Sequence, residues 1–341
     1  MRLSFLLLVV GLTTLFPAIG QRPHMLRPFQ MGKRGIPYGN YSGITPLGNG
    51  QYALVDDKKE RCGFHLIKIV QDSMSGKVTD LLYEGFKGEG PALHPDAEDL
   101  VYVPSRHSIF MTSEARQTIE EYTCQGQATG YGLDIPPCFS SDSIQRNCGW
   151  EALAYDSCNK TFYTITECSL PADGVRTDQR QPLRLISFNE LLKPEQEWGY
   201  LMEAPRLKSK ARYYAHGVPA LLYEDNGNII VMERELRVPS SYIGAKTIIR
   251  LFRIHVDDSS ILTTTLPLNS APFDLFLKKE EIASFTTRLN ITRRNFANYE
   301  GMCFGITLKN GRRTLLLVND SQGGMGNHLV RLKDYIKVIV L

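Results

Sequence analysis

Short apolar segments alternate with polar turns along most of the chain, and long stretches of helical periodicity are scarce. The segments are rich in Val, Ile, Tyr and Thr and are bounded by Gly, Pro, Asn or Asp, which is typical of short β-strands. Only residues 277–286 have the spacing of a helix, and that helix would be short. The clearest predicted strands are Tyr52–Val55, His65–Val70, Ser108–Met111, Thr161–Ile165, Ile229–Met232, Thr247–Ile254, Thr314–Val318 and Tyr335–Val340.

The strands recur in a self-similar unit. Segments that begin at Glu98 and Glu151 both carry Leu two positions later, Tyr four positions later and a second Glu sixteen positions later. Related units begin near residues 42, 219 and 300, and polar turns that each contain Asn-Gly separate their apolar runs, which is a strong hairpin signal. Each unit therefore predicts a strand, a tight turn and a second strand that ends in or beside an acidic residue.

Repeats of this length that contain only strands predict an all-β protein with the β-propeller fold, in which each unit begins one blade. Five units are legible, and the long intervals 156–218 and 236–299 leave room for another, so we expect six blades. A β-sandwich or several small β domains is the alternative. Because single blades cannot bury their faces alone, we expect one propeller domain at residues 41–341.

The first twenty residues have a different pattern. Arg2 precedes an apolar run that ends at Phe16, and the small residues Ala18 and Gly20 fit a cleavage site, so residues 1–20 are predicted to be a signal peptide. We expect a secreted protein, or a periplasmic one in a bacterium. No later stretch reaches 18 consecutive apolar residues, so no membrane span is expected.

Residues 21–40 are expected to form an N-terminal arm. The arm contains Gly32-Lys33-Arg34, a triplet that also occurs at amidation and dibasic cleavage sites of secreted peptide precursors. A basic arm ahead of the first blade is the simpler interpretation, and the sequence leaves open whether the triplet is processed.

An oxidising compartment favours disulfide bonds between cysteines. Five of the seven cysteines fall within 45 residues, at spacings that match no zinc motif, and the odd total leaves at least one thiol unpaired within the chain. The candidates for disulfide bonds are Cys124, Cys138, Cys148, Cys158 and Cys168. The candidates for N-glycosylation are Asn40, Asn159, Asn290 and Asn319.

Composition and charge exclude several classes of protein. The 39 basic and 36 acidic residues give a net charge of +3 with no block of like charge, so neither nucleic-acid binding nor a polybasic membrane patch is indicated. A hydrophobic fraction of 43% is ample for a packed core. The chain has no GxSxG, HExxH or Walker-type motif, so a serine esterase has no recognisable nucleophile here.

Four segments resemble the phytase-like family, described as "esterase-like activity of phytase". They are Gly149–Tyr155, Val231–Glu235, Asn298–Met302 and Leu315–Ser321. The similarity spans about residues 40–338, and it implies a β-propeller, a secreted or periplasmic setting and a hydrolase. Two places depart from the family pattern, because Asp99 replaces a Gly and residues 218–220 contain no Glu.

The recurring acids suggest a metal site. If the first strand of each blade lines a central channel, the acids near its ends converge on the axis, where they repel one another unless a cation lies between them. Ca²⁺ accepts oxygen ligands from scattered side chains, and it can polarise an ester and lower the pKa of a bound water, with another Glu as general base. The alternative is an architectural role, in which each Glu accepts backbone N–H groups of a neighbouring blade.

These considerations give a set of candidate site residues. The predicted catalytic residues are Glu151, Glu300 and His216. The predicted metal ligands are Glu98, Glu167, Asp320 and Asp56. A second equivalent set of acids contains Glu114, Glu167, Glu235 and Asp320.

A basic cluster next to His216 is a candidate for binding a small anionic ester substrate. It contains Lys210 and Arg212, preceded by Lys208, although an ordinary solvated loop would have the same composition. Propellers also bind ligands without turnover. The second functional hypothesis is therefore a non-catalytic propeller that binds an unknown extracellular protein, glycan or peptide.

Overall fold

A computed structural model describes residues 22–59, 61–88, 96–207, 210–240, 242–262, 267–290, 295–325 and 331–341. The predicted signal peptide and Lys208 lie outside these ranges. In the part of the chain that the structure describes, no helix is long and apolar enough to cross a membrane.

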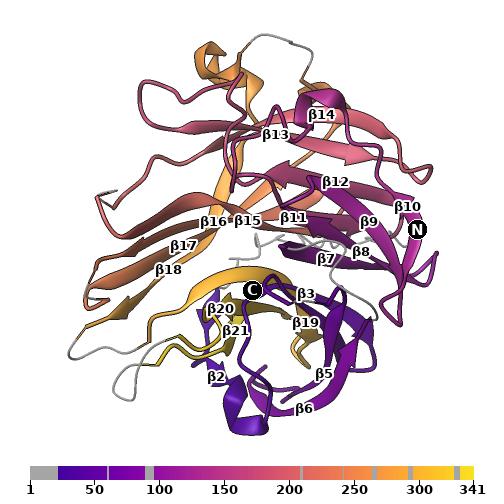
Figure 1. The fold of residues 1–341 in the computed structure, drawn as a ribbon, viewed down its shortest axis with the longest axis vertical. Coiled ribbons are helices and arrows are strands. Elements are labelled where there is room, and N and C mark those ends of the chain that lie inside the picture. The colour runs from indigo at the N-terminus through magenta and orange to yellow at the C-terminus, as the bar shows by residue number, and fades with distance from the viewer. Residues whose placement is uncertain are drawn as a thin grey trace, which may run out of the picture.

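The described residues form five antiparallel sheets, which are the blades of a β-propeller (Figure 1). Blade 1 consists of β3 (Tyr41–Gly48), β4 (Gln51–Asp56), β5 (Phe64–Gln71) and β6 (Val78–Lys87). Blade 2 consists of β7 (Ala97–Val103), β8 (Ser108–Ser113), β9 (Thr118–Thr123) and β10 (Ala128–Gly132). Blade 3 consists of β11 (Trp150–Asp156), β12 (Thr161–Thr166), β13 (Gln181–Phe188) and β14 (Pro194–Met202).

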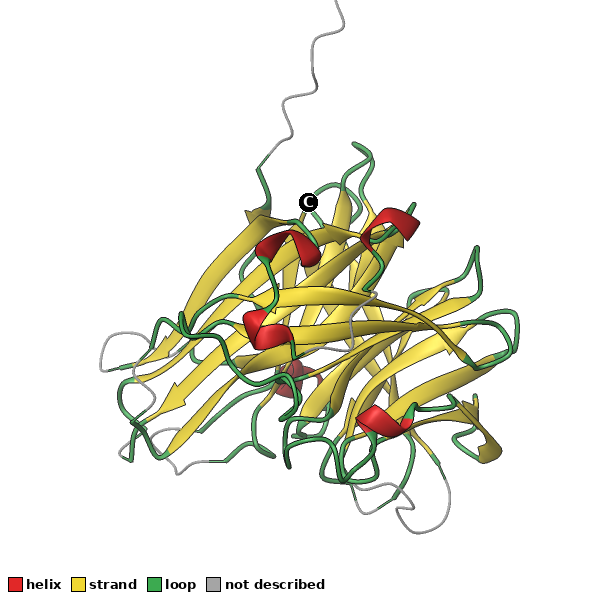
Figure 2. Ribbon diagram, turned by 90° about the horizontal axis from the view of Figure 1, so that it is seen from above, coloured by secondary structure: helices red, strands yellow, loops and turns green. Residues whose placement is uncertain are grey.

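The last two blades complete the ring. Blade 4 consists of β15 (Tyr213–Asp225), β16 (Asn228–Val238), β17 (Ala245–His255) and β18 (Lys279–Leu289). Blade 5 consists of β19 (Asn298–Thr307), β20 (Arg313–Asp320), β21 (Tyr335–Val340), β1 (His24–Met25) and β2 (Phe29–Gln30). Short 3-10 helices lie in the connections, as Figure 2 shows, at Met31–Arg34, Pro137–Phe139, Asp258–Ser260, Leu268–Ser270 and Phe273–Leu275.

The first strand of each blade is the innermost one. Strands β3, β7, β11, β15 and β19 pack side by side in this order, and β19 returns to β3, so the ring is closed. Two glycines permit this close approach. A Cβ atom added to Gly43 would lie 2.7 Å from Cα of Asp99, and one added to Gly301 would lie 2.9 Å from Cα of Gly43.

Aromatic pairs and one buried carboxylate join neighbouring blades. Phe110 of blade 2 lies 4.6 Å from Phe162 of blade 3, between ring centroids. Asp99, which departs from the family pattern, accepts the N–H of Leu153 in the next blade at 2.9 Å. A carboxylate at this position therefore links two inner strands, and burial raises its pKa well above the usual range.

The propeller prediction is confirmed, and all five legible units are the inner hairpins of blades, but the expected sixth blade is absent from the described residues. The two long intervals contain the outer strands and connections of blades 3 and 4. The predicted helix at 277–286 is wrong, because residues 279–286 belong to β18, an edge strand paired with β17 along its length. A short window with helical spacing cannot reveal a partner strand that is distant in sequence.

The residues predicted as an N-terminal arm form part of blade 5. Strands β1 and β2 both pair with β21, so the two ends of the chain meet in one sheet. Leu26 and Met31 are buried against this sheet, and Gly32-Lys33-Arg34 belongs to the 3-10 helix that follows. This segment closes the ring, which gives it a structural role independent of any processing.

Candidate functional site

Acidic side chains from four of the five blades gather at one end of the innermost strands. Because the first two strands of each blade are antiparallel, the start of the first strand lies beside the end of the second. This geometry gathers a group that we call the carboxylate cluster, which consists of Asp57, Glu98, Glu114, Glu151, Glu167, Glu300 and Asp320. Most of the predicted acids are thus brought together, as the repeat implied.

Arg234 of β16 is the main cation inside this cluster. Its guanidinium donates to a carboxylate oxygen of Glu167 and to Oε1 of Glu300 at 2.5 Å, and it lies 3.8 Å from Oε2 of Glu151. The side chain is only 5% exposed. Although burial alone would lower it, the pKa of Arg234 is raised by the three surrounding carboxylates, so the group stays charged.

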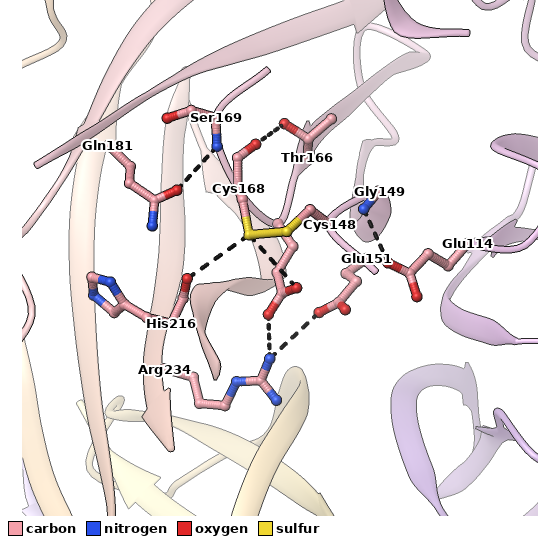
Figure 3. The surroundings of a disulfide bond; sticks show 11 residues. Glu114, Cys148, Gly149, Glu151, Thr166, Cys168, Ser169, Gln181, His216 and Arg234 are labelled. Carbon is pink, nitrogen blue, oxygen red and sulfur yellow. Dashed lines mark hydrogen bonds and ion pairs between the residues drawn. A yellow bond between two sulfur atoms is a disulfide. The ribbon is translucent and has the colours of Figure 1, made fainter. Parts of the chain in front are cut away.

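Three carboxylates form the tightest group of acids on the blade 2 and blade 3 side. One oxygen atom from each of Glu114, Glu151 and Glu167 lies within 4.8 Å of the others. Gly149 connects two of them, because its N–H donates to Glu114 at 3.0 Å (Figure 3). The carbonyl of Gly149 accepts the N–H of Glu167 at 2.8 Å. On the blade 4 side, Gly217 leaves room for Glu167, since a Cβ there would lie 2.3 Å from Cγ of Glu167.

The cluster holds more negative charge than its cations balance. Burial and repulsion between neighbours raise the pKa of Glu98, Glu151 and Glu300 well above the usual range. Burial also raises the pKa of Glu114. Such carboxyl groups either retain protons or require a further cation nearby.

The blade 1 side of the cluster is built around Asp57. Burial raises the pKa of Asp57 to about 6, and Lys58 partly opposes this shift through an ion pair of 2.7 Å. Lys58 also pairs with Asp96 at 2.9 Å. The neighbouring Asp56, which was a predicted metal ligand, instead accepts the backbone N–H groups of Asn40 and Lys58 at 3.2 and 3.3 Å. Asp57 rather than Asp56 therefore supplies blade 1's acid to the cluster.

The sequence model of the family described as "Phytase-like: Esterase-like activity of phytase" matches residues 36–322. The chain belongs to this family. No curated protein matches it.

Solved structures give only distant similarities. An exo-1,5-α-L-arabinanase from a bovine ruminal metagenomic library has 10% identity and a TM-score of 0.43, covering 87% of this chain and 92% of its own. The periplasmic gluconolactonase of Pseudomonas aeruginosa has 12% identity and a TM-score of 0.37, covering 86% and 85%. A streptogramin B lyase has 12% identity and a TM-score of 0.36, covering 94% and 98%.

Sequence reasoning assigned no role to Arg234, although the residue stands in one of the family-like segments. The missed signal lies in blade 4, whose first strand has no Glu at the repeat position. That blade contributes the cation instead, from its second strand. Glu114 was noted as a repeated acid but not selected as a ligand.

His216 is not brought to the acids. Its ring points away from Glu151 and Arg234 (Figure 3), on the face of β15 that pairs with Glu235. Burial lowers the pKa of His216 to about 4, so the ring is neutral at physiological pH. Glu235 is architectural, because it accepts the backbone N–H groups of Arg206 and Leu207 at 2.8 and 2.7 Å.

The predicted basic cluster is exposed at the end of blade 4. Lys210 and Arg212 are both exposed, and the guanidinium of Arg212 lies 5.1 Å from the ring of Tyr213 and 5.8 Å from that of Tyr242. No described ion pair connects either base to the carboxylate cluster. Their role in substrate binding stays a prediction.

One disulfide joins Cys148 and Cys168, with their Cα atoms 5.1 Å apart. Cys124, Cys138 and Cys158 are free thiols in this structure, so the expected wider network of disulfides is not formed. Their place in separate turns and loops explains this, since proximity in sequence does not imply proximity in space.

The four sequons differ in exposure. Asn159 is exposed and Asn290 is half-buried, whereas Asn40 and Asn319 are buried. The amide nitrogen of Asn319 donates to two backbone carbonyls, which a glycan would disrupt. Asn159 is therefore the most accessible of the predicted glycosylation sites.

Proposed function

We propose that this protein is a hydrolase of phosphate or carboxylate esters whose active centre is the carboxylate cluster. The observation that carries the proposal is the convergence of carboxylate oxygens of Glu114, Glu151 and Glu167 within 4.8 Å of one another. Family membership supports an ester as the class of substrate. Perturbed carboxyl groups that gather in one place are typical of functional sites.

The donor set of the cluster fits a hard divalent cation such as Ca²⁺. Three carboxylates supply only oxygen atoms, and burial together with repulsion from neighbouring carboxylates raises the pKa of Glu114 and Glu151. Glu114, Glu151 and Glu167 would hold the ion, which when bound would polarise an ester oxygen and lower the pKa of a water molecule. Asp320 and Glu98, both predicted as ligands, belong to the carboxylate cluster but not to this group of three.

The remaining groups would position ligands or transfer protons. Arg234 fixes the carboxylates of Glu167 and Glu300, and Asn298 donates a second hydrogen bond to Glu300 at 2.7 Å. Among the described residues no cation lies within hydrogen-bonding distance of Glu98, and its raised pKa favours the protonated form. Glu98 is thus suited to donate a proton to a leaving group, as a general acid.

The proposal is tested by assaying the purified chain with phytate, a simple aryl phosphate, an aryl acetate and a lactone, with Ca²⁺ and after chelation. We expect hydrolysis of at least one substrate, loss of activity on chelation, and a loss of at least 100-fold in Glu151→Gln. Glu190→Gln is the matched control, because Glu190 is exposed and pairs only with Lys160 at the surface. A folded, Ca²⁺-loaded chain that is inert toward all four substrates would contradict the hydrolase proposal.

Ligand binding without turnover is the second candidate. The observation that favours it is a group of exposed apolar side chains beside the Arg212 stack, at Tyr213 (50% exposed), Ile243 (57%) and Met325 (46%). If the protein only binds a ligand, the chain should be inert toward all four substrates. It should retain a ligand from the native milieu, and Tyr213→Ser should abolish this retention. The same variant leaves hydrolysis unchanged if the carboxylate cluster alone is the functional site.

We also propose that the protein is secreted, with residues 1–20 removed. The Cys148–Cys168 disulfide supports an oxidising compartment. Mass spectrometry of the mature N-terminus should find Gln21 still joined to the propeller, as expected for a segment that closes blade 5. A mature chain that begins after Arg34 would instead support processing at the dibasic triplet.

A further inference from the structure

The disulfide lies directly against the carboxylate cluster. Cys168 follows Glu167 in sequence, and its sulfur lies 3.9 Å from Oε2 of Glu167, while the other carboxylate oxygen of Glu167 accepts a hydrogen bond from Arg234. Cys148 precedes Gly149, the residue that connects Glu114 to Glu167. The only disulfide of the described residues therefore joins the start of β11 to the end of β12, beside the acids.

Its two sulfur atoms and Glu167 form a second group of possible metal ligands. One ligand atom each from Cys148, Glu167 and Cys168 lies within 4.8 Å of the others. Two thiolates and a carboxylate suit Zn²⁺, which prefers sulfur, nitrogen and carboxylate ligands in a tetrahedral arrangement. While the sulfur atoms are bonded to each other, neither is a thiolate, so this group cannot bind zinc.

We propose that reduction of the Cys148–Cys168 disulfide creates a zinc site, in which the two thiolates and the Glu167 carboxylate bind one Zn²⁺ ion. Cys168 is half-exposed, so a reductant can reach its sulfur, whereas Cys148 is only 8% exposed. Arg234 contacts Glu167 through the oxygen that does not face the sulfur, so the ion pair and the metal bond use different atoms. The fourth coordination position remains for water.

The reaction balances with a dithiol as reductant. A thiolate of the dithiol attacks the sulfur of Cys168, the bond between the two cysteines breaks, and Cys148 leaves as a thiolate. The second thiol of the reductant then releases Cys168 and becomes oxidised to a cyclic disulfide. Each cysteine gains one electron and can take up one proton, and binding of Zn²⁺ releases these protons to solvent.

Glu167 is shared between this site and the proposed Ca²⁺ site. If Zn²⁺ is bound by the two thiolates and Glu167, Glu167 is no longer available to bind Ca²⁺ together with Glu114 and Glu151. The redox state of the disulfide would therefore decide which cation Glu167 binds. The zinc site does not depend on hydrolase activity, because it requires only the geometry of Cys148, Glu167 and Cys168. Its test therefore uses a spectroscopic readout rather than turnover.

The experiment titrates the mature full-length chain with Co²⁺, a spectroscopic substitute for Zn²⁺, before and after reduction with a dithiol that is then removed under anaerobic conditions. The reduced chain should bind one Co²⁺ per molecule with thiolate-to-cobalt charge-transfer absorption, which one equivalent of Zn²⁺ abolishes. The oxidised chain should show no such absorption. Glu167→Gln should weaken Co²⁺ binding by about tenfold or more, as expected from the loss of one ligand.

Controls separate this pair from the other cysteines. The triple variant Cys124→Ser/Cys138→Ser/Cys158→Ser should keep the full absorption, whereas Cys148→Ser should lose it. If Cys148→Ser does not fold, alkylation of the reduced wild-type chain decides instead, because bound Zn²⁺ should protect Cys148 and Cys168 from modification. Absence of charge transfer in the reduced wild type, or protection confined to other cysteines, would overturn the proposal.

Discussion

Glu233 and Arg234 are neighbours on β16, yet they belong to two opposite kinds of buried ion cluster. Glu233 is one carboxylate among several donors, because it accepts from Lys279 and Tyr200 at 2.7 Å each and lies 3.2 Å from Arg250. Arg234 is one cation among three carboxylates. Strand alternation places the two side chains on opposite faces of blade 4, so one residue step separates them.

The comparison distinguishes architecture from a candidate site. Around Glu233, every charged group has a partner, and the backbone N–H of Glu203 also donates to it, at 3.2 Å. Around Arg234, the acids outnumber the cations, and burial raises the pKa of Glu151 and Glu300. A balanced cluster holds strands together, whereas an unbalanced one is destabilising unless it binds something.

The largest effect is expected from breaking the balanced cluster. Glu233→Gln should reduce the free energy of unfolding by about 3–5 kcal/mol, because it leaves the buried Arg250 and Lys279 without their shared carboxylate. Urea unfolding at neutral pH measures this loss. Glu190→Gln is the control, since its exposed pair with Lys160 should contribute less than about 1 kcal/mol. Equal effects of the two variants would contradict the comparison.

Removal of Arg234 should cost less and should be reversible by metal. Arg234→Met should lower the free energy of unfolding by about 2 kcal/mol, because the carboxyl groups that it leaves can take up protons. Added Ca²⁺ should restore much of this loss by binding the native state, and should not rescue Glu233→Gln. Calorimetric melting of both variants with and without Ca²⁺ measures the difference. Equal rescue of both would show that the two clusters do not differ as described.

The repeat pattern predicted much of this arrangement. Glu98, Glu151 and Glu300 start equivalent strands, so recognising the hairpins was enough to expect them at one end of a channel. Arg234 escaped prediction because it occupies a second strand, in a blade whose first strand lacks the repeated Glu. Its three partners come from two other blades, at separations of 66 and 67 residues for the two hydrogen bonds, which no local pattern reveals.

The errors at His216 and Asp56 have a common cause. Alternate residues of a strand face opposite sides, so an error of one position exchanges a site residue for a structural one. His216 lies on the same face of blade 4 as Glu235 and not beside the carboxylate cluster. Asp56 accepts hydrogen bonds from backbone N–H groups, whereas Asp57 belongs to the cluster. The sequence predicts the hairpin register to within about one residue, which is not accurate enough to tell on which face of the strand a given side chain lies.

A third buried acid extends the comparison to a carboxyl group with no described ion pair. Asp334 is 1% exposed, and burial raises its pKa to about 7. Its native pKa exceeds the unfolded value of 3.8, so the native state binds more protons and stability falls as pH rises from about 4 to about 7. Asp334→Asn cannot titrate, so its stability relative to wild type should increase by about 2 kcal/mol between pH 5 and pH 8.

This prediction is measured by urea unfolding of both proteins at several pH values. The increase should be confined to the window between the two pKa values and should level off above pH 8. A constant difference between the proteins across this range would show that Asp334 is ionised in the native state at pH 5.

The smallest change in stability is expected from substitution of Glu98 in the carboxylate cluster. Glu98 faces Asp57, Glu300 and Glu114, and Lys58 is the weakest of the influences on it. Glu98→Gln is neutral without taking up a proton and changes the shape little, so it removes the cost of protonating a buried carboxyl group and should stabilise the metal-free chain by about 1 kcal/mol at neutral pH. If Glu98 is the proposed general acid, the same variant loses hydrolysis while it gains stability. Melting and activity measured on one preparation decide this, since an architectural Glu98 would lose stability on substitution and leave activity intact.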